Sequence, residues 1–423
     1  MTGKQPLVKE LLRALTLKDA VGVGLGAIVG AGIFVVTGVA AGVSGPAFIV
    51  GLAIAGIIAA FNGLSSAQLA AIYPHSGGTY EYGYRLINPV FGFSAGWMFL
   101  ISKLSAAGVV AIGFGSYFYQ LVPVSSPLII SVVAVIFLTA ANYFGIKKAG
   151  KLNLIIVSIT LLSLVYLVFS GIPAVKAENF RSFAPFGLSG IAEASALLFF
   201  AFTGYARIAT LAEEVKEPEK TIPKAVIITI VSAIILYAVV SVVAVGVIGT
   251  ASMADSKSPL QVVADALTTP AIRTVVTIGA STAMLGVLLS QILGISRMML
   301  AMGRRHDLPP VFQAIHRNYR VPHLGIIITG VVILLLTILG TFEFIVRAAT
   351  FTILLYYSIT NISALRQPRK EQIYGRVIPV VGLIGCLSMS VSLPLNVIAS
   401  GIGLLIAGFI LRFLMHTIYA KKE

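Results

Sequence analysis

The chain has 423 residues, of which 58% are hydrophobic and 11% charged, and its mean hydropathy is +0.99. Soluble globular proteins carry about 25% charged residues, so the composition excludes a soluble fold, and the high hydrophobicity excludes a disordered chain. The class that remains is an integral membrane protein. The net charge of +15 would indicate nucleic-acid binding only if the basic residues gathered on one folded face.

Twelve apolar runs are long enough to cross a bilayer core, which takes roughly 20 residues per helix. They predict an all-α membrane protein of about twelve transmembrane helices. The residues before the first run are too charged for a signal peptide and predict a cytosolic N-terminal segment. The runs are residues 20–43, 46–72, 90–119, 126–144, 152–173, 191–213, 222–249, 271–302, 323–340, 344–364, 377–391 and 396–415.

Basic residues are distributed unevenly around these runs. Twenty-two of the thirty lysines and arginines lie in the two terminal segments and in every second loop. The other loops carry only Lys176, Arg181, Lys257 and Arg273. Because basic residues stay on the cytosolic side of a membrane, both termini are expected in the cytosol, at the plasma membrane. The positive charge therefore marks topology, and nucleic-acid binding is excluded.

The first and sixth runs are interrupted by glycine. The first contains Gly30-Ala31-Gly32, and the sixth contains Thr203-Gly204 at its centre. Glycines at this density also suit close helix packing, and from the first run alone the two interpretations are equally good. Paired interruptions in corresponding helices favour inverted repeats around a midplane site. A half-helix N-terminus suits a carboxylate and free carbonyls suit an ammonium, so a zwitterionic amino acid fits both breaks.

Several motifs occur in a familiar order along residues 15–415. They are GAGIF at 30–34, GP at 45–46, YPHSGGTYEYGY after the second run, NYFG at 142–145, FFAFTGYARIATLAEEVKEPEKTIPKA at 199–225 and SRMMLAMGRRHDLPPVFQAIHRNYRVPH at 296–323. The ordered set resembles the amino acid–polyamine–organocation superfamily of permeases, closest to the bacterial branch that is similar to cationic amino acid transporters.

The resemblance implies a five-plus-five inverted-repeat fold with discontinuous helices 1 and 6 and two further C-terminal helices. The implied divisions are residues 1–18, 19–173 (first repeat), 191–364 (second repeat), 377–415 (helices 11 and 12) and 416–423 (cytosolic tail). It also implies alternating access around the two breaks. By position, the residues implied to contact substrate are Ile28, Gly30, Ala31, Gly32, Ile33, Phe200, Thr203, Gly204 and Ala206. Phe200 takes the aromatic gate position, although packing would also account for it.

The coupling ion is less clear from the sequence. All five histidines fall in loops or at membrane edges, so no intramembrane histidine relay is expected. Proton-coupled members of the superfamily carry a lysine in span five, where this chain has Thr160, which is a departure from the pattern. The Thr160 hydroxyl would suit Na⁺, but the corresponding part of span eight, residues 284–286, lacks hydroxyl groups.

Lys103 lies near the middle of span three. A fixed charge at that depth costs at least about 2.5–3.5 kcal/mol, and a buried amine avoids the cost by giving up its proton, since desolvation disfavours the charged form. Lys103 is therefore either a proton-coupling group or a fixed cation that replaces Na⁺. The alternative is a structural lysine, neutralised by a carbonyl or snorkelling to the interface.

Arg207 follows the break in span six, next to Ala206, where relatives carry an acidic residue. Arginine does not titrate usefully, so Arg207 is a structural cation or a substrate contact, and a position in the site would disfavour cationic substrates. Glu213 lies at the cytosolic end of the same span. It is either a solvated helix-end charge or part of an inner gate.

The paired breaks and the topology favour a secondary active transporter of amino acids, with H⁺-coupled symport as the first hypothesis and Na⁺-independent exchange as the alternative. No HExxH motif is present, and the one GxSxG match, GFSAG at 92–96, lies within an apolar run, so an enzyme is not expected. A channel or a sensor is a weaker alternative, since neither a repeated filter nor a long soluble loop is visible. The expected partners are an amino acid, membrane lipid and H⁺, with no cofactor, no metal and no nucleic acid.

Overall fold

The computed structural model describes residues 15–73, 77–123, 126–145, 149–210 and 215–420. Within these ranges every regular element is a helix, and the only β-type pairing is an isolated bridge between Leu15 and Val215. The all-α fold expected for this class of membrane protein is therefore confirmed.

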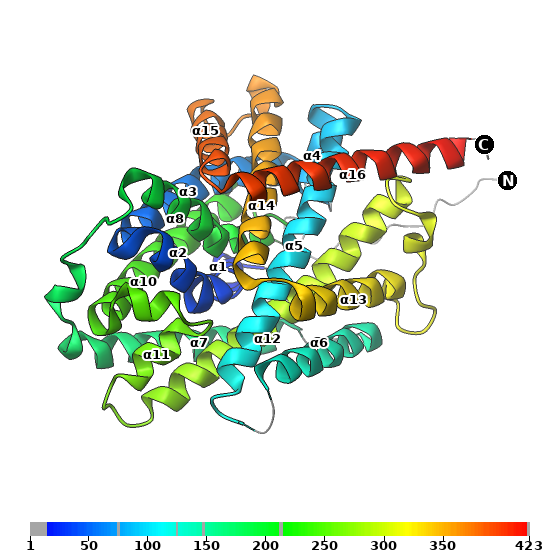
Figure 1. Ribbon diagram of the computed structural model, residues 1–423. Coiled ribbons are helices and arrows are strands. Elements are labelled where there is room, and N and C mark those ends of the chain that lie inside the picture. Colours follow the sequence, from blue (N-terminus) through cyan, green and yellow to red (C-terminus); the bar gives the residue numbers. More distant parts are fainter. Residues whose placement is uncertain (1–14, 74–76, 124–125, 146–148, 211–214, 421–423) are drawn as a thin grey trace.

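Two helices, α5 and α14, run side by side through the middle of the molecule, and α16 runs along one side of it (Figure 1). The main helices are α1 (Leu17–Ile28), α2 (Thr37–Ser44), α3 (Phe48–Ile72), α4 (Thr79–Leu86), α5 (Pro89–Phe118), α6 (Pro127–Phe144), α7 (Ala149–Gly171), α8 (Gly187–Phe202), α9 (Ala206–Thr210), α10 (Pro218–Ala254), α11 (Pro259–Asp265), α12 (Ile272–Arg304), α13 (His323–Leu339), α14 (Phe342–Arg366), α15 (Val377–Val391) and α16 (Leu395–Ala420). Seven short π or 3₁₀ turns connect them: η1 (Gly32–Val36), η2 (Gly45–Ala47), η3 (Ile172–Ala174), η4 (Ala177–Phe180), η5 (Thr203–Tyr205), η6 (Pro310–Gln313) and η7 (Arg369–Glu371).

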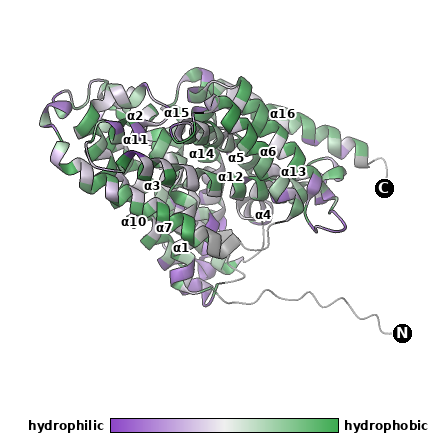
Figure 2. Cartoon of the chain, turned by 90° about the horizontal axis from the view of Figure 1, so that it is seen from below, coloured by the Kyte–Doolittle hydropathy of each residue, from purple (hydrophilic) through white to green (hydrophobic). Residues whose placement is uncertain are grey.

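Each of the twelve apolar runs coincides with a helix or a pair of helices. Nine described segments are long and apolar enough to span a membrane, and the first of them, Leu17–Ile72, contains the first two runs. The shorter apolar helices α13 and α15 account for the ninth and eleventh runs. Figure 2 shows apolar residues along the helices and hydrophilic residues concentrated in the connecting loops, as expected for a chain surrounded by lipid.

Both predicted helix interruptions are present. The first helix ends at Ile28, Val29 adopts an extended conformation, and the chain resumes as a π-helical turn, η1, that leads directly into α2. The second break lies at η5, where α8 gives way to a 3₁₀ turn before α9. Backbone groups released at these points need partners inside the protein, and the surrounding helices supply several of them.

Two short helices lie in segments that were expected to be loops. The segment between spans two and three folds into α4 (Thr79–Leu86), which packs on α5, and the segment before span eight contains α11 (Pro259–Asp265), which packs on α10 and α12. Neither has a long apolar run, so hydropathy alone does not identify them.

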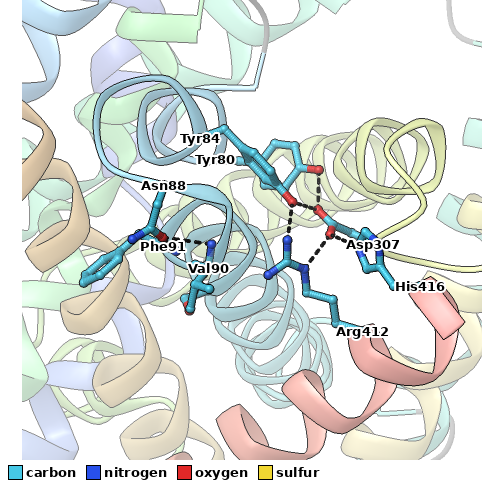
Figure 3. A network of polar contacts seen from close by, with 9 residues as sticks. Tyr80, Tyr84, Asn88, Val90, Phe91, Asp307, Arg412 and His416 are labelled. Atoms are coloured by element: carbon cyan, nitrogen blue, oxygen red, sulfur yellow. Dashed lines mark hydrogen bonds and ion pairs between the residues drawn. The ribbon is translucent and has the colours of Figure 1, made fainter. Parts of the chain in front are cut away.

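Asn88 caps the N-terminus of α5. Its side-chain oxygen accepts hydrogen bonds from the Val90 and Phe91 N–H groups at 2.9 and 3.0 Å (Figure 3).

Candidate functional site

The two helix breaks pack directly against each other. A Cβ atom added to Gly32 would lie 2.4 Å from the Ala201 Cβ, and one added to Gly204 would lie 2.2 Å from the backbone carbonyl of Ala27. Each break thus contributes a glycine that lets the other helix approach more closely than any side chain permits. This reciprocal packing brings the first and sixth spans together at their broken segments.

A cavity of about 40 Å³ lies at this crossing. That volume holds only a few water-sized molecules, so any larger ligand requires the lining helices to separate. The cavity is lined by residues of both breaks and by side chains from α5 and α12, among them Lys103, Val110, Val287 and Gln291.

Seven of the nine residues predicted to contact substrate line this cavity. They are Ile28, Gly30, Ala31, Gly32, Phe200, Thr203 and Gly204. Two do not line it: Ile33 is completely buried in η1, and Ala206 begins α9 beyond the second break. The sequence did not single out Val110, Val287 or Gln291, since a valine or a glutamine within an apolar run gives no local sign that it faces a cavity.

Hydrogen bonds from neighbouring helices hold the backbone at both breaks. The Tyr237 hydroxyl donates to the Ile28 carbonyl at 2.8 Å, at the end of α1. The Tyr357 hydroxyl donates to the Thr203 carbonyl at 3.2 Å, and the Thr203 hydroxyl donates to the Phe200 carbonyl at 3.0 Å. These bonds satisfy carbonyls that the interrupted helices leave unpaired, so α10 and α14 keep the breaks in place.

Positive charge is concentrated beside the cavity. Lys103 lines it, and its ammonium lies 5.9 Å from the centre of the Phe99 ring. The Arg207 guanidinium donates to the Ser290 carbonyl at 3.4 Å and interacts electrostatically with Lys103. Arg207 itself does not line the cavity. None of the described lining residues is acidic.

Gln291 stands out among the lining residues. Its side-chain oxygen is buried and accepts no hydrogen bond from any described part of the chain. A buried acceptor without a partner costs free energy, and such groups are typical of sites that a ligand completes. Gln291 comes from α12, directly after Ser290, the residue that holds Arg207.

The remaining predicted coupling residues lie away from the cavity. Thr160 on α7 is buried, and its hydroxyl lies 2.8 Å from the Ile156 carbonyl and 3.3 Å from the Gly279 carbonyl on α12. It therefore joins α7 to α12. Glu213 lies outside the described residues. The Cys386 thiol is buried, as expected for a packed cysteine, and donates to the Asn62 side-chain oxygen at 3.3 Å.

Two further sets of polar contacts join helices outside the cavity lining. The Tyr117 hydroxyl donates to the Phe34 carbonyl at 2.6 Å and accepts a hydrogen bond from the Leu260 N–H at 3.2 Å, so α5 links η1 to α11. Arg347 on α14 and Glu193 on α8 form an ion pair at 3.0 Å. Both side chains are largely buried, with exposures of 22% and 19%.

A further cluster surrounds one carboxylate, which the sequence did not predict. Asp307 follows α12 and is completely buried. The Tyr80 and Tyr84 hydroxyls, one turn apart on α4, donate to one of its oxygens at 2.7 and 2.5 Å. Arg412 on α16 donates to the other oxygen at 3.0 Å, and the His416 imidazole lies 3.7 Å away (Figure 3).

These contacts form what we call the Asp307 clamp, made of Tyr80, Tyr84, Asp307, Arg412 and His416. Burial, reinforced by the Asp307 carboxylate, raises the pKa of both tyrosines, which keeps their hydroxyls protonated as donors at neutral pH. The clamp ties three distant segments together: α4, the segment after α12, and α16. A buried charge needs this degree of pairing to be tolerated.

An all-α chain with twelve apolar helical segments and a polar-lined cavity where two helices are broken defines a class of protein, the multi-pass membrane transporters. A model of the amino acid permease family matches residues 15–416. The chain belongs to this family, as the resemblance to the amino acid–polyamine–organocation superfamily predicted, and it is a transporter rather than an enzyme.

Individual relatives agree with this assignment. The chain is 38% identical to an uncharacterized transporter of Mycobacterium tuberculosis over 401 residues, which covers 94% of this chain and 90% of that protein. It is 28% identical to the branched-chain amino acid permease BcaP of Bacillus subtilis (98% and 94% covered) and 28% identical to the methylthioribose transporter of the same organism (91% and 89% covered).

Proposed function

We propose that the protein is a secondary active transporter that carries an amino acid through the cavity between the two helix breaks by alternating access. The observation that carries this proposal is the reciprocal packing of Gly32 on Ala201 and of Gly204 on Ala27, which places both breaks around one polar-lined cavity. Family membership supplies the substrate class in general terms. Because the cavity holds only a few water molecules, substrate entry must accompany an opening motion.

The two breaks suit the two ends of an amino acid. The N–H groups of Ala31 and Gly32 stand in the first turn of a helical stretch that continues to Ser44, where helices leave N–H groups without partners, and they suit the carboxylate. The last carbonyls of α8 suit the ammonium. Phe200, near the end of α8, lines the cavity and is the aromatic gate in this proposal.

We further propose that the two halves of the chain, residues 19–173 and 191–364, are inverted repeats that rock against each other. The uneven distribution of basic residues supports an orientation in the plasma membrane with both termini in the cytosol. In this orientation the Glu193–Arg347 pair lies toward the outside and the Asp307 clamp toward the cytosol. Three spans separate Glu193 from Asp307 and one span separates Asp307 from Arg347, and an odd number of spans places two segments on opposite sides of the membrane.

The coupling we propose is H⁺ symport with Lys103 as the coupling group. Its position in the cavity supports this role, since it can bind a proton beside the substrate and release it when the site faces the cytosol. Thr160 is an alternative element of coupling through Na⁺, but its distance from the cavity lining and its contact with two carbonyls favour a structural role. Exchange without ion coupling is the alternative, and the experiment must distinguish it from H⁺ symport.

The test is uptake by the purified protein in proteoliposomes, with a panel of labelled amino acids and with or without a pH gradient or Na⁺. The proposal predicts accumulation that depends on an acidic exterior and not on Na⁺. Lys103→Gln and Lys103→Arg both remove a titratable amine, but only the arginine keeps the charge. Both variants should lose proton-driven accumulation while Lys103→Gln retains exchange. Accumulation that survives in both would overturn the role of Lys103.

A further inference from the structure

We propose that Lys103 and Gln291 together restrict the cavity to amino acids whose side chain carries no positive charge. This inference rests on the proposed function, because it assigns the substrate class of the same cavity. Lys103 reaches the cavity from α5 and Gln291 from α12, whereas the two breaks supply backbone, apolar side chains and the Thr203 hydroxyl. Among the described lining residues, the cationic side chain and the carboxamide therefore come from these two residues.

The argument begins with charge. Lys103 is the one cationic residue among those that line the cavity in the described chain, and none of the described lining residues is acidic. A cationic group of a substrate that lay about 6 Å from the Lys103 ammonium would be repelled by it. At an effective dielectric constant of about 20, this repulsion would weaken binding about 100-fold. A lysine-like or arginine-like substrate would meet this repulsion at the cavity wall.

Gln291 then sets what the cavity accepts instead. Its buried side-chain oxygen has no partner in the described residues, so a substrate N–H or O–H that donates to it recovers free energy. An amide, however, carries no net charge and does not neutralise Lys103. The apolar side chains of Val110 and Val287 complete the lining and leave room for uncharged groups. The pair thus admits neutral and acidic side chains and rejects cationic ones.

The names of the relatives point in both directions. A branched-chain amino acid permease and a methylthioribose transporter carry, by those names, solutes without a cationic side chain, whereas two relatives from Arabidopsis thaliana are named cationic amino acid transporters. The charge argument does not depend on them, because it follows from the lining residues alone.

The experiment is counterflow in proteoliposomes loaded with a transported neutral amino acid, which needs no ion coupling and so separates selectivity from energisation. Arginine and lysine compete against the labelled substrate, with leucine and glutamate as reference competitors. Lys103→Met removes the repelling charge, and Gln291→Glu supplies a carboxylate that offsets it. Lys220→Met, at an exposed side chain, is the matched control.

For the wild type and Lys220→Met we expect no competition by arginine or lysine. In Lys103→Met and Gln291→Glu, competition by both cationic amino acids should strengthen at least tenfold. The inference is overturned if arginine competes with the wild type as well as leucine does, or if either variant keeps counterflow and still rejects cations. The two substitutions are on different helices. If one variant fails to fold, the competition assay on the other still tests the inference. Absence of counterflow for every amino acid in the wild type would instead contradict the proposed function.

Discussion

Gly204 has no space for even a methyl group, and this makes it the most sensitive position at the breaks. A Cβ there would lie 2.2 Å from the backbone carbonyl of Ala27, and backbone cannot move aside as the end of a flexible side chain can. We expect Gly204→Ala to force the two broken helices apart and to lower uptake at least tenfold. The measurement is initial-rate uptake in proteoliposomes, normalised to the amount of reconstituted protein.

A glycine in open surroundings is the control for this prediction. Gly403 in α16 has no atom within 4 Å of an added Cβ, and alanine is the better helix former by about 1 kcal/mol. Gly403→Ala should therefore transport as the wild type does. Normal uptake by Gly204→Ala would show that the close approach of the two breaks is not needed for transport.

The residues of the cavity differ in how visible they are in the sequence. The glycines of both breaks and Lys103 are anomalies in apolar runs, and such anomalies can be recognised locally. Gln291 is a polar residue that also suits helix packing, so its orientation toward the cavity depends on how α12 sits against the breaks. Arg207 is also an anomaly in an apolar run, but which carbonyl it contacts is a property of the packed structure.

At the scale of whole elements, the Asp307 clamp joins helices that are far apart in the chain. Asp307→Ala leaves the Arg412 charge, which is only 15% exposed, without its counter-ion. Breaking a buried pair in this way typically costs about 3–5 kcal/mol. We expect a clearly lower midpoint of thermal unfolding for the purified protein in detergent, and smaller losses for Tyr80→Phe or Tyr84→Phe, each of which removes one hydroxyl donor.

An exposed ion pair provides the comparison. Glu178 and Arg181 lie 3.8 Å apart and are 73% and 80% exposed, and pairs in this environment contribute little. Glu178→Ala should leave the unfolding midpoint unchanged. If Asp307→Ala unfolded at the same temperature as Glu178→Ala, the clamp would not be holding α4 and α16 to the segment after α12.

The ion pair between Glu193 and Arg347 links α8, which leads into the second break, to α14. We expect Glu193→Gln and Arg347→Gln to be non-additive in thermal unfolding, with a coupling free energy of about 1 kcal/mol, because the pair is largely but not fully buried. The exchanged pair, Glu193→Arg with Arg347→Glu, should recover part of the loss. Strict additivity of the two single changes would contradict a direct interaction.

The elements themselves were predictable to different degrees. Long apolar runs identified the spans because lipid forces their composition, and the glycines identified the breaks. The helices α4 and α11 were missed, since each is under nine residues long and has too few periodic positions to signal a helix. The clamp was also missed, because Tyr80, Asp307 and Arg412 come together only through tertiary packing.

The whole molecule combines a scaffold with two broken helices at its centre. Tyr117, the Glu193–Arg347 pair and the Asp307 clamp each join helices that are far apart in the chain. In the proposed orientation the first two lie toward the outside and the clamp lies toward the cytosol. A transporter that works by alternating access must loosen contacts on one face while it keeps those on the other. The cavity volume of about 40 Å³ is too small for an amino acid in this arrangement, so binding must accompany such a motion.

The central claim is that the substrate occupies the cavity between the breaks, and a single engineered cysteine tests it most directly. The native thiol of Cys386 is buried, so the wild type should resist a membrane-impermeant thiol reagent. Val287 lines the cavity beside Gly30, and Val287→Cys should become labelled as the protein cycles. The account predicts that a transported amino acid slows this labelling at least tenfold, whereas a non-transported one does not. Labelling that proceeds at the same rate with and without saturating substrate would contradict it.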